Sequence, residues 1–254
     1  MKPVRPERTT FPIANSSRHE CVVTDDGTRT LRDLTTGDTF HSESGALAES
    51  LKVFIENGEL EELLSSRQEV QVFETGFGTG LNFFLAASTA LLTQSGSLFY
   101  DAVEPYPIST EAWRSLEYSK IEHCQPGYRQ FADSIDLYSA RDLKIVSDLV
   151  ELKLFHRDLE SHFRSISNRQ DSYDLVFHDP FSPESAPELW EVATFQKLFK
   201  ILKPGGRLLT YCVKSKVQKT LLEAGFEIRK TKGPAGGKRE VLIAIKPFKE
   251  CGSI

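Results

Sequence analysis

The order of apolar and polar positions predicts strands and helices in regular succession from residue 70 to the end of the chain. Segments with the composition of strands are expected at 70–75, 97–103, 152–156, 173–178, 208–213, 226–230 and 240–246. Apolar residues recur at helical spacing over 81–92, 109–121, 187–202 and 216–224. This alternation predicts an α/β fold with a seven-stranded, mostly parallel sheet and helices on both faces. The last two strands are expected to pair antiparallel.

The first 58 residues have a different pattern and are interpreted as an N-terminal β appendage. Strand-like segments flank Asp25-Asp26-Gly27, which is a hairpin signal, and an amphipathic helix begins near Ser44 and ends at Gly58. The main domain is expected to cover 59–250. Within it, residues 123–150 interrupt the alternation and are predicted to form a helical insertion, with Ile145 to Leu149 as a helical patch.

A glycine-rich turn follows the first strand of the main domain. Residues 72–80 read Val-Phe-Glu-Thr-Gly-Phe-Gly-Thr-Gly, so Glu74 is followed by Gly76, Gly78 and Gly80. Glycine lets the backbone approach a ligand closely, which a side chain would prevent. The spacing is not the dinucleotide pattern G-x-G-x-x-G, which weakens the case for a nicotinamide oxidoreductase. It resembles the first motif of methyltransferases that use S-adenosyl-L-methionine (SAM), where the glycines lie under the methionine half of SAM.

Four consecutive strands end in an acid, namely Glu74, Glu104, Asp158 and Asp179. Ligands of open α/β sheets bind beyond the carboxyl ends of the strands, so a cofactor site is predicted at this edge. Glu104 follows Gly80 at the distance where an acid can accept hydrogen bonds from two ribose hydroxyls. Asp158 is either an acceptor for the adenine amino group or the N-cap of the next helix. Glu74 either orients the loop or binds the cofactor amine.

The fourth of these strands continues into His178-Asp179-Pro180-Phe181-Ser182-Pro183. This segment resembles the (Asp/Asn)-Pro-Pro-(Phe/Tyr) loop of methyltransferases that act on exocyclic amines. A carboxylate can hydrogen-bond an amine, aim it and help remove its proton, so Asp179 is the main catalytic candidate and is also counted in the cofactor site. Phe181 is expected to position a ring substrate by stacking, and His178 is a secondary candidate. The alternative is a proline-stiffened connection with a buried Phe181.

Charge is distributed unevenly along the 254 residues, whose net charge is −5. Residues 197–254 carry 14 Lys and Arg against 4 Asp and Glu, and this excess either contacts a polyanion or keeps the surface solvated. No apolar stretch approaches the roughly 18 residues of a membrane span, and no signal-peptide pattern is present. The four cysteines are far apart, so neither a metal site nor a disulfide framework is expected, and a reducing cytoplasm fits best.

Further motifs extend the resemblance to one family. The chain contains Glu74-Thr-Gly-Phe-Gly-Thr-Gly-Leu-Asn-Phe83, the segment 178–183 followed by Pro187-Glu-Leu-Trp190, and Gly205-Gly-Arg-Leu-Leu-Thr-Tyr-Cys-Val213. Together they resemble the MnmC-like tRNA methyltransferase family, in its stand-alone (MnmD-like) form. The resemblance implies SAM-dependent methylation of the aminomethyl nitrogen of 5-aminomethyl-uridine, often 2-thiolated, at tRNA wobble position 34.

The resemblance also implies roles and partners. Gly76, Gly78 and Gly80 would cradle SAM with Glu74 beside them, Glu104 would hold the ribose, Asp158 the adenine, and Asp179 would face the amine. Two-domain relatives carry an FAD-dependent oxidoreductase domain. Because the chain ends at Ile254 without a second Gly-rich unit, no FAD is expected. The expected partner is the tRNA anticodon loop, and the candidate phosphate contacts are Lys214, Lys216, Lys219, Lys238 and Arg239.

Two other functions remain open at this point. Spermidine-synthase-like aminopropyl transferases place an acid before proline at the same strand end and also attack amines, although a polyamine substrate would leave the basic C-terminal region without a role. A non-catalytic module that binds SAM or RNA is the second alternative, and the intact Asp179 and glycine turn argue against it.

Overall fold

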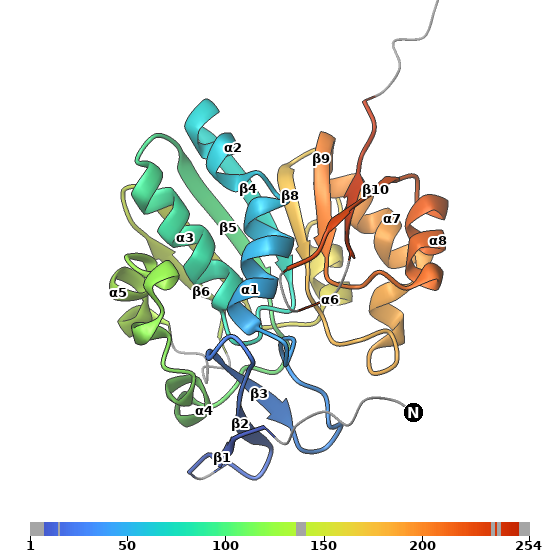
Figure 1. Cartoon of the computed structure of the whole chain (residues 1–254). Coiled ribbons are helices and arrows are strands. Elements are labelled where there is room, and N and C mark those ends of the chain that lie inside the picture. Colours follow the sequence, from blue (N-terminus) through green and yellow to red (C-terminus); the bar gives the residue numbers. More distant parts are fainter. Residues whose placement is uncertain (1–7, 15, 136–140, 235–236, 238–239, 249–254) are drawn as a thin grey trace, which may run out of the picture.

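A mixed eight-stranded sheet forms the centre of the described part of the protein (Figure 1). The structure is a computed structural model that describes residues 8–14, 16–135, 141–234, 237 and 240–248. In sheet order the strands are β10 (Glu227–Lys232), β11 (Glu240–Ile245), β9 (Leu202–Thr210), β8 (Tyr173–His178), β4 (Glu69–Thr75), β5 (Ser97–Val103), β7 (Val150–Phe155) and β6 (Leu143–Val146). The run from β9 to β7 is parallel, and β6, β11 and β10 are antiparallel to their neighbours. The predicted mostly parallel α/β fold is confirmed, as is the antiparallel final pair.

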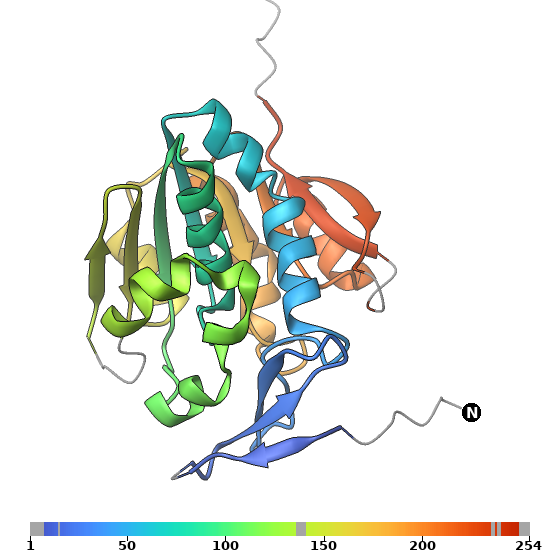
Figure 2. The same ribbon diagram turned by 60° about the vertical axis from the view of Figure 1, so that its left-hand side comes forward.

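Helices cover both faces of this sheet (Figures 1 and 2). One face carries α1 (Ala46–Ser50), the π-helical η1 (Leu51–Glu56), α2 (Leu60–Ser66), α3 (Leu81–Thr93), α4 (Thr110–Ser115), η2 (Tyr118–Lys120), η3 (Glu122–Cys124), α5 (Gly127–Phe131) and η4 (Ala132–Ser134). The other face carries α6 (Leu159–Ser165), η5 (Pro187–Trp190), α7 (Val192–Ile201) and α8 (Ser215–Glu223). None of the helices in the described part of the chain has the length and apolar character that crossing a membrane requires.

The alternation of side chains along the central strands produces two separate cores. On β4, Val72 packs with the α3 layer while its neighbour Phe73 packs with the α6–α8 layer. On β8, Phe177 and Val176 divide between the layers in the same way. Successive side chains of a strand point to opposite faces, so a strand buried on both faces is apolar at every position. This is why the central strands were the easiest elements to predict from sequence.

Two parts of the main domain differ from the prediction. Residues 143–146 form the edge strand β6 rather than part of a helical patch, and this strand raises the sheet from the seven strands expected to eight. Leu143 and Ile145 pack on the core while Lys144 points outward and pairs with Glu151 of β7. That alternation has the period of a strand. The other difference is β9, which begins at Leu202 directly after α7 rather than at residue 208.

The N-terminal residues form a small antiparallel sheet of β1 (Thr10–Pro12), β2 (His19–Val23) and β3 (Arg29–Asp33). The hairpin turn predicted at Asp25-Asp26-Gly27 joins β2 to β3, and Gly27 has the positive φ of 81° that favours glycine. Figure 2 shows this sheet beside one end of the large sheet. The Arg29 guanidinium donates to the Ser115 carbonyl at 2.9 Å, which ties the small sheet to the end of α4.

Candidate active site

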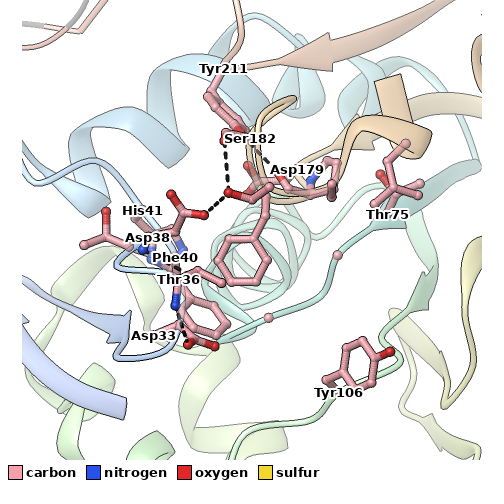
Figure 3. Close-up of a pocket in the computed structure, with 18 of the residues that line it drawn as sticks. Asp33, Thr36, Asp38, Phe40, His41, Thr75, Tyr106, Asp179, Ser182 and Tyr211 are labelled. Atoms are coloured by element: carbon pink, nitrogen blue, oxygen red, sulfur yellow. Dashed lines mark hydrogen bonds between the residues drawn. The ribbon is translucent and has the colours of Figure 1, made fainter. Parts of the chain in front are cut away.

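A pocket of about 920 Å³ lies between the carboxyl ends of the central strands and the N-terminal sheet (Figure 3). Residues after β4, β5, β7 and β8 line one side, as the fold rule for open α/β sheets predicts. Residues 36–44, which follow β3, line the opposite side, and the Phe40 ring there is in edge-to-face contact with Phe181. The N-terminal sheet therefore forms a wall of the pocket.

The glycine-rich turn lies where no side chain would fit. Gly76 has a φ of +83°, and a Cβ at this position would lie 2.9 Å from the carbonyl oxygen of Asp179. Gly78 has a φ of +52°, and its Cβ would lie 3.2 Å from the ring of Phe40. Both glycines line the pocket. Gly80 does not line it, and is instead the left-handed N-cap residue of α3.

Glu104 holds this turn from the neighbouring strand. Its carboxylate accepts a hydrogen bond from the Gly78 N–H at 2.9 Å and another from the Tyr106 N–H at 2.9 Å. Burial raises the pKa of Glu104, and the two N–H donors oppose that rise. The side chain lines the pocket, as expected of an acid that could accept ribose hydroxyls.

Asp158 also lines the pocket, but its two oxygens are already engaged. They accept from the Ser161 N–H at 2.7 Å and from the Ser161 hydroxyl at 2.8 Å, so Asp158 is the N-cap of α6. These bonds lower the pKa of Asp158. The N-cap alternative therefore describes the local structure. Contact with an adenine amino group stays a prediction, since a carboxylate oxygen can accept more than one hydrogen bond.

Asp179 and Phe181 sit on a loop that is held on both sides. The Asp179 N–H donates to the Thr75 carbonyl at 3.1 Å, and the Trp190 indole donates to the Phe181 carbonyl at 2.9 Å. Both side chains line the pocket, and the Phe181 ring meets the edge of Phe40 at a centroid distance of 5.1 Å. The loop thus presents a carboxylate and an aromatic ring together. The prolines around Phe181 do not bury it in the core.

Glu74 lies behind the pocket and not in its lining. The side chain is 1% exposed, accepts from the Asn82 amide at 2.8 Å through one oxygen, and accepts from the Tyr100 hydroxyl at 2.8 Å through the other. Burial raises the pKa of Glu74 to about 8, although both donors favour the ionised form. The geometry supports the loop-orienting alternative for Glu74 rather than direct contact with a cofactor.

His178 is also absent from the pocket lining, which corrects its placement as a secondary catalytic candidate. It is fully buried, its Nδ1 lies 2.8 Å from the Thr75 hydroxyl, and its ring packs edge-on against Trp190 and Phe195. Burial lowers the pKa of His178 to about 3, so the ring is neutral at physiological pH. The side chain points into the core because strand alternation directs Asp179 and His178 to opposite sides.

Of the lysines expected to contact tRNA, Lys214, Lys216 and Lys219 are exposed and lie outside the pocket lining. Lys214 pairs with Glu184 on the loop after β8, and Lys216 and Lys219 are on α8. Lys238 and Arg239 lie outside the described residues, while Gly237 beside them lines the pocket. Several other cations of the basic C-terminal region are engaged in ion pairs, among them Lys197, Lys203, Arg207, Lys230 and Lys246.

Sequence reasoning missed several residues of this region, among them Phe40 and Asn82. Phe40 belongs to the N-terminal part, and only folding brings it against Gly78 and Phe181. Asn82 donates to Glu74 and, at 2.9 Å, to Asp179 as well. The available signal for Asn82 was a polar residue within the otherwise apolar start of α3. The described residues contain no cluster of His, Cys, Asp and Glu placed to bind a metal ion.

The raised pKa of Glu74 gives a prediction for stability. Between pH 4.5, the ordinary pKa of a glutamate, and a pH of about 8, the folded protein holds a proton that the unfolded chain releases. Stability contributed by this group therefore falls as pH rises, by on the order of 1.4 kcal/mol per pH unit. Glu74→Gln removes the titration while keeping a neutral side chain. We expect the stability advantage of Glu74→Gln over the wild type to grow from pH 5 to pH 8 in urea unfolding.

Buried histidines also make the stability of both proteins depend on pH, but they do not affect the comparison. His41 and His178 have pKa values lowered to about 4 and about 3, so their contribution to stability rises with pH up to about 6.5. Both proteins keep these histidines, so their contribution cancels in the difference. If the curves of unfolding free energy against pH run parallel for wild type and Glu74→Gln from pH 5 to pH 8, the pKa of Glu74 is not raised.

Comparison with known proteins agrees with this geometry. The family model described as S-adenosyl-L-methionine-dependent methyltransferase matches residues 122–247. The bifunctional protein MnmC of Campylobacter fetus subsp. fetus, named for tRNA 5-methylaminomethyl-2-thiouridine biosynthesis, is 35% identical over 177 residues, covering 69% of this chain and 28% of the relative. The protein of the same name from Ralstonia nicotianae is 32% identical over 215 residues, covering 83% and 32%. The chain spans about a third of the length of these relatives.

Solved structures share the fold. The crystal structure of MnmC2 from Aquifex aeolicus aligns with a TM-score of 0.76 at 22% identity, over 93% of this chain and 74% of that chain. Spermidine synthase from Thermotoga maritima aligns with a TM-score of 0.54 at 11% identity, over 93% and 72%. The fold, the strand-end pocket and the family match define a SAM-dependent methyltransferase. Within that class the chain belongs to the MnmC-like family, as its motifs indicated.

Proposed function

We propose that this enzyme methylates the aminomethyl nitrogen of 5-aminomethyl-uridine, with or without 2-thiolation, at tRNA wobble position 34. The product is 5-methylaminomethyl-uridine. The observation that carries the proposal is one pocket that joins the glycine-rich turn to Asp179 and Phe181. The relatives, which are named for tRNA 5-methylaminomethyl-2-thiouridine biosynthesis, support this choice of substrate. The proposed tRNA substrate also supports a cytoplasmic location.

The residues at the turn fit SAM. Gly76 and Gly78 leave open the space that a Cβ would take against the Asp179 backbone and the Phe40 ring, and Glu104 presents a carboxylate to the same pocket. We assign the methionine half of SAM to the glycines and the ribose to Glu104. SAM, when bound, supplies a methyl group on a positively charged sulfur to an amine nitrogen, which loses one proton in the exchange.

The side chains of the opposite wall would then prepare the amine. Asp179 accepts hydrogen bonds from it, which aims the nitrogen and favours loss of its proton. Phe181 and Phe40, whose rings are in edge-to-face contact, together form an aromatic wall against which a uracil ring can pack. The pocket is lined by many acids and few cations, which suits a substrate that enters as an ammonium ion; the acids are Asp33, Asp38, Glu43, Glu49, Glu104, Asp158, Asp179 and Glu188.

That acidic lining would repel RNA phosphate, so only the base can enter. A wobble base lies in a single-stranded loop and can be turned into a pocket without melting a helix. We infer that the phosphates of the anticodon loop stay outside and meet exposed cations such as Lys216 and Lys219 on α8. Lys214, Lys238 and Arg239 complete the proposed contact surface.

The proposal is tested by incubating the protein with methyl-labelled SAM and bulk tRNA from a strain that lacks this modification. We expect label in tRNA, and mass analysis of wobble nucleosides should show conversion of 5-aminomethyl-uridine to its N-methyl form. Bulk tRNA that already carries the product is the matched control and should take up little label.

A polyamine substrate is the second candidate, because the acidic lining and the fold shared with spermidine synthase also suit it. Turnover of polyamines with decarboxylated SAM, together with no label in tRNA, would replace the proposed function by this one.

A further inference from the structure

A buried row of four side chains connects the core to the pocket. The Tyr100 hydroxyl donates to Glu74 at 2.8 Å, and the Asn82 amide donates to Glu74 at 2.8 Å and to Asp179 at 2.9 Å. Only Asp179 of these four lines the pocket, and Asn82 is 3% exposed. The row therefore ends at the carboxylate assigned to the amine.

The chemistry of the row leaves one orientation for the Asn82 amide. The same atom of Asn82 approaches an oxygen of Glu74 and an oxygen of Asp179. A carboxylate oxygen of Asp179 accepts hydrogen bonds and an amide oxygen cannot donate one, so the Asn82 atom between the two acids is the nitrogen, whose two hydrogens serve one carboxyl group each. A serine or a leucine at this position could not bridge the pair in this way.

The position of Asn82 in the chain gives the bridge its significance. It lies in the first turn of α3, two residues after Gly80, so its backbone continues directly from the glycine-rich turn. Asp179 directly follows strand β8, nearly a hundred residues later in the sequence. The amide is thus a link between the loop assigned to the methyl donor and the carboxylate assigned to the methyl acceptor.

We propose that Asn82 is a positioning residue for methyl transfer, which holds the Asp179 carboxylate in register with the glycine-rich turn while Glu74 and Tyr100 hold Asn82. This inference rests on the proposed function. Alignment of nitrogen, methyl carbon and sulfur is an orientation effect, and displacement of a reacting group by about 1 Å can cost on the order of 10²-fold in rate. Asn82 acts through Asp179 and does not itself face the pocket.

The row also contains a sign that packing alone does not explain Asn82. Its Oδ1 is buried and has no hydrogen-bond partner within the described part of the chain. A buried acceptor without a donor is unfavourable, and an apolar side chain of the same size would avoid that penalty. The amide is therefore used for its two N–H groups.

A double-mutant cycle tests the proposal. Asn82→Leu removes both donors at nearly constant volume, and we expect kcat to fall by about 10- to 100-fold while the Kd for SAM by calorimetry changes by less than about threefold. If Asn82 acts through Asp179, the double variant Asn82→Leu/Asp179→Asn is about as slow as Asp179→Asn alone. Multiplicative losses would overturn the proposal.

Ser88→Ala is the matched control. Ser88 lies on the same helix, is 1% exposed, and accepts a hydrogen bond from the Gly127 N–H at 2.9 Å, away from the pocket. Its loss should lower the Tm and leave kcat unchanged within about twofold. A fall in kcat as large as that of Asn82→Leu would mean that α3 responds to any buried change, which would contradict a specific role for Asn82.

A measurement on the cofactor-free protein separates this inference from the proposed function. Carboxyl ¹³C titration of Glu74 should give a pKa of about 8 in the wild type and a higher value in Asn82→Leu, because a donor to the ionised form is lost. An unchanged titration would refute the bridge even in a protein that methylates tRNA. Absence of methyl transfer to tRNA in the wild type would instead refute the proposed function.

Discussion

Asp179→Asn is expected to lower the rate of methyl transfer by about 10²-fold or more while the affinity for SAM changes little. Asparagine has the same shape, and the loop that carries it is held by backbone bonds to Thr75 and by Trp190, so the pocket should keep its form. What is lost is a carboxylate that can accept the proton leaving the amine, and such groups contribute about 10² to 10⁴ in rate. Single-turnover methylation and SAM calorimetry measure the two effects separately.

Asp171→Asn provides the control for this exchange. Asp171 precedes the same strand, β8, at the end away from the pocket, and its carboxylate pairs with Lys246. Its φ of 45° is one that asparagine also tolerates. Activity should therefore stay within about twofold. Full methyl transfer by Asp179→Asn with normal SAM binding would show that the carboxylate has no catalytic role.

Gly76→Ala is expected to disable the pocket, with activity reduced by at least tenfold and the free energy of unfolding reduced by about 2 to 5 kcal/mol. Two effects add at this position. Alanine at a φ of +83° is strained, and its methyl group would lie 2.9 Å from the Asp179 carbonyl oxygen and 3.2 Å from the Pro180 Cα. Backbone atoms cannot rotate away, so either the turn or the Asp179 loop must shift.

Gly27→Ala separates the two effects. Gly27 has nearly the same φ, +81°, but a Cβ there meets nothing within 4 Å. The variant should lose only the conformational term, about 1 to 2 kcal/mol, and should retain activity. Urea unfolding and methylation assays on both variants give the comparison. Equal losses of stability in the two would show that crowding against residue 179 is unimportant.

The most predictable part of the fold was its centre. Strands β4, β5 and β8 are apolar along nearly their whole length because both faces are covered, and their ends fell within one or two residues of expectation. The edge of the sheet was harder to predict from the sequence. β6 lies on the rim of the sheet, its pattern is short and half polar, and pairing with β7 decides its conformation.

For the candidate site, the sequence predicted which residues lie at the strand ends but not the directions of their side chains. Each acid at a strand end could be found because the carboxyl ends of parallel strands meet at one edge. Sequence could not say which way each acid points. Glu74 and His178 turn inward to Asn82 and Thr75, whereas Asp179 turns to the pocket, and Asp158 caps a helix. Burial and the available hydrogen-bond partners decided those directions.

The amino-acid sequence by itself determined the class of protein, because the glycine spacing and the acids at strand ends are local signals that need no knowledge of distant contacts. It also predicted that the turn at Gly76 and Gly78 approaches a ligand closely. Only the tertiary structure brought Phe40, which follows the N-terminal sheet, into the pocket wall and placed Asn82 between Glu74 and Asp179. The contacts of Phe40 with Phe181 and of Asn82 with Asp179 join segments far apart in the sequence, and they depend on packing geometry that no local pattern encodes.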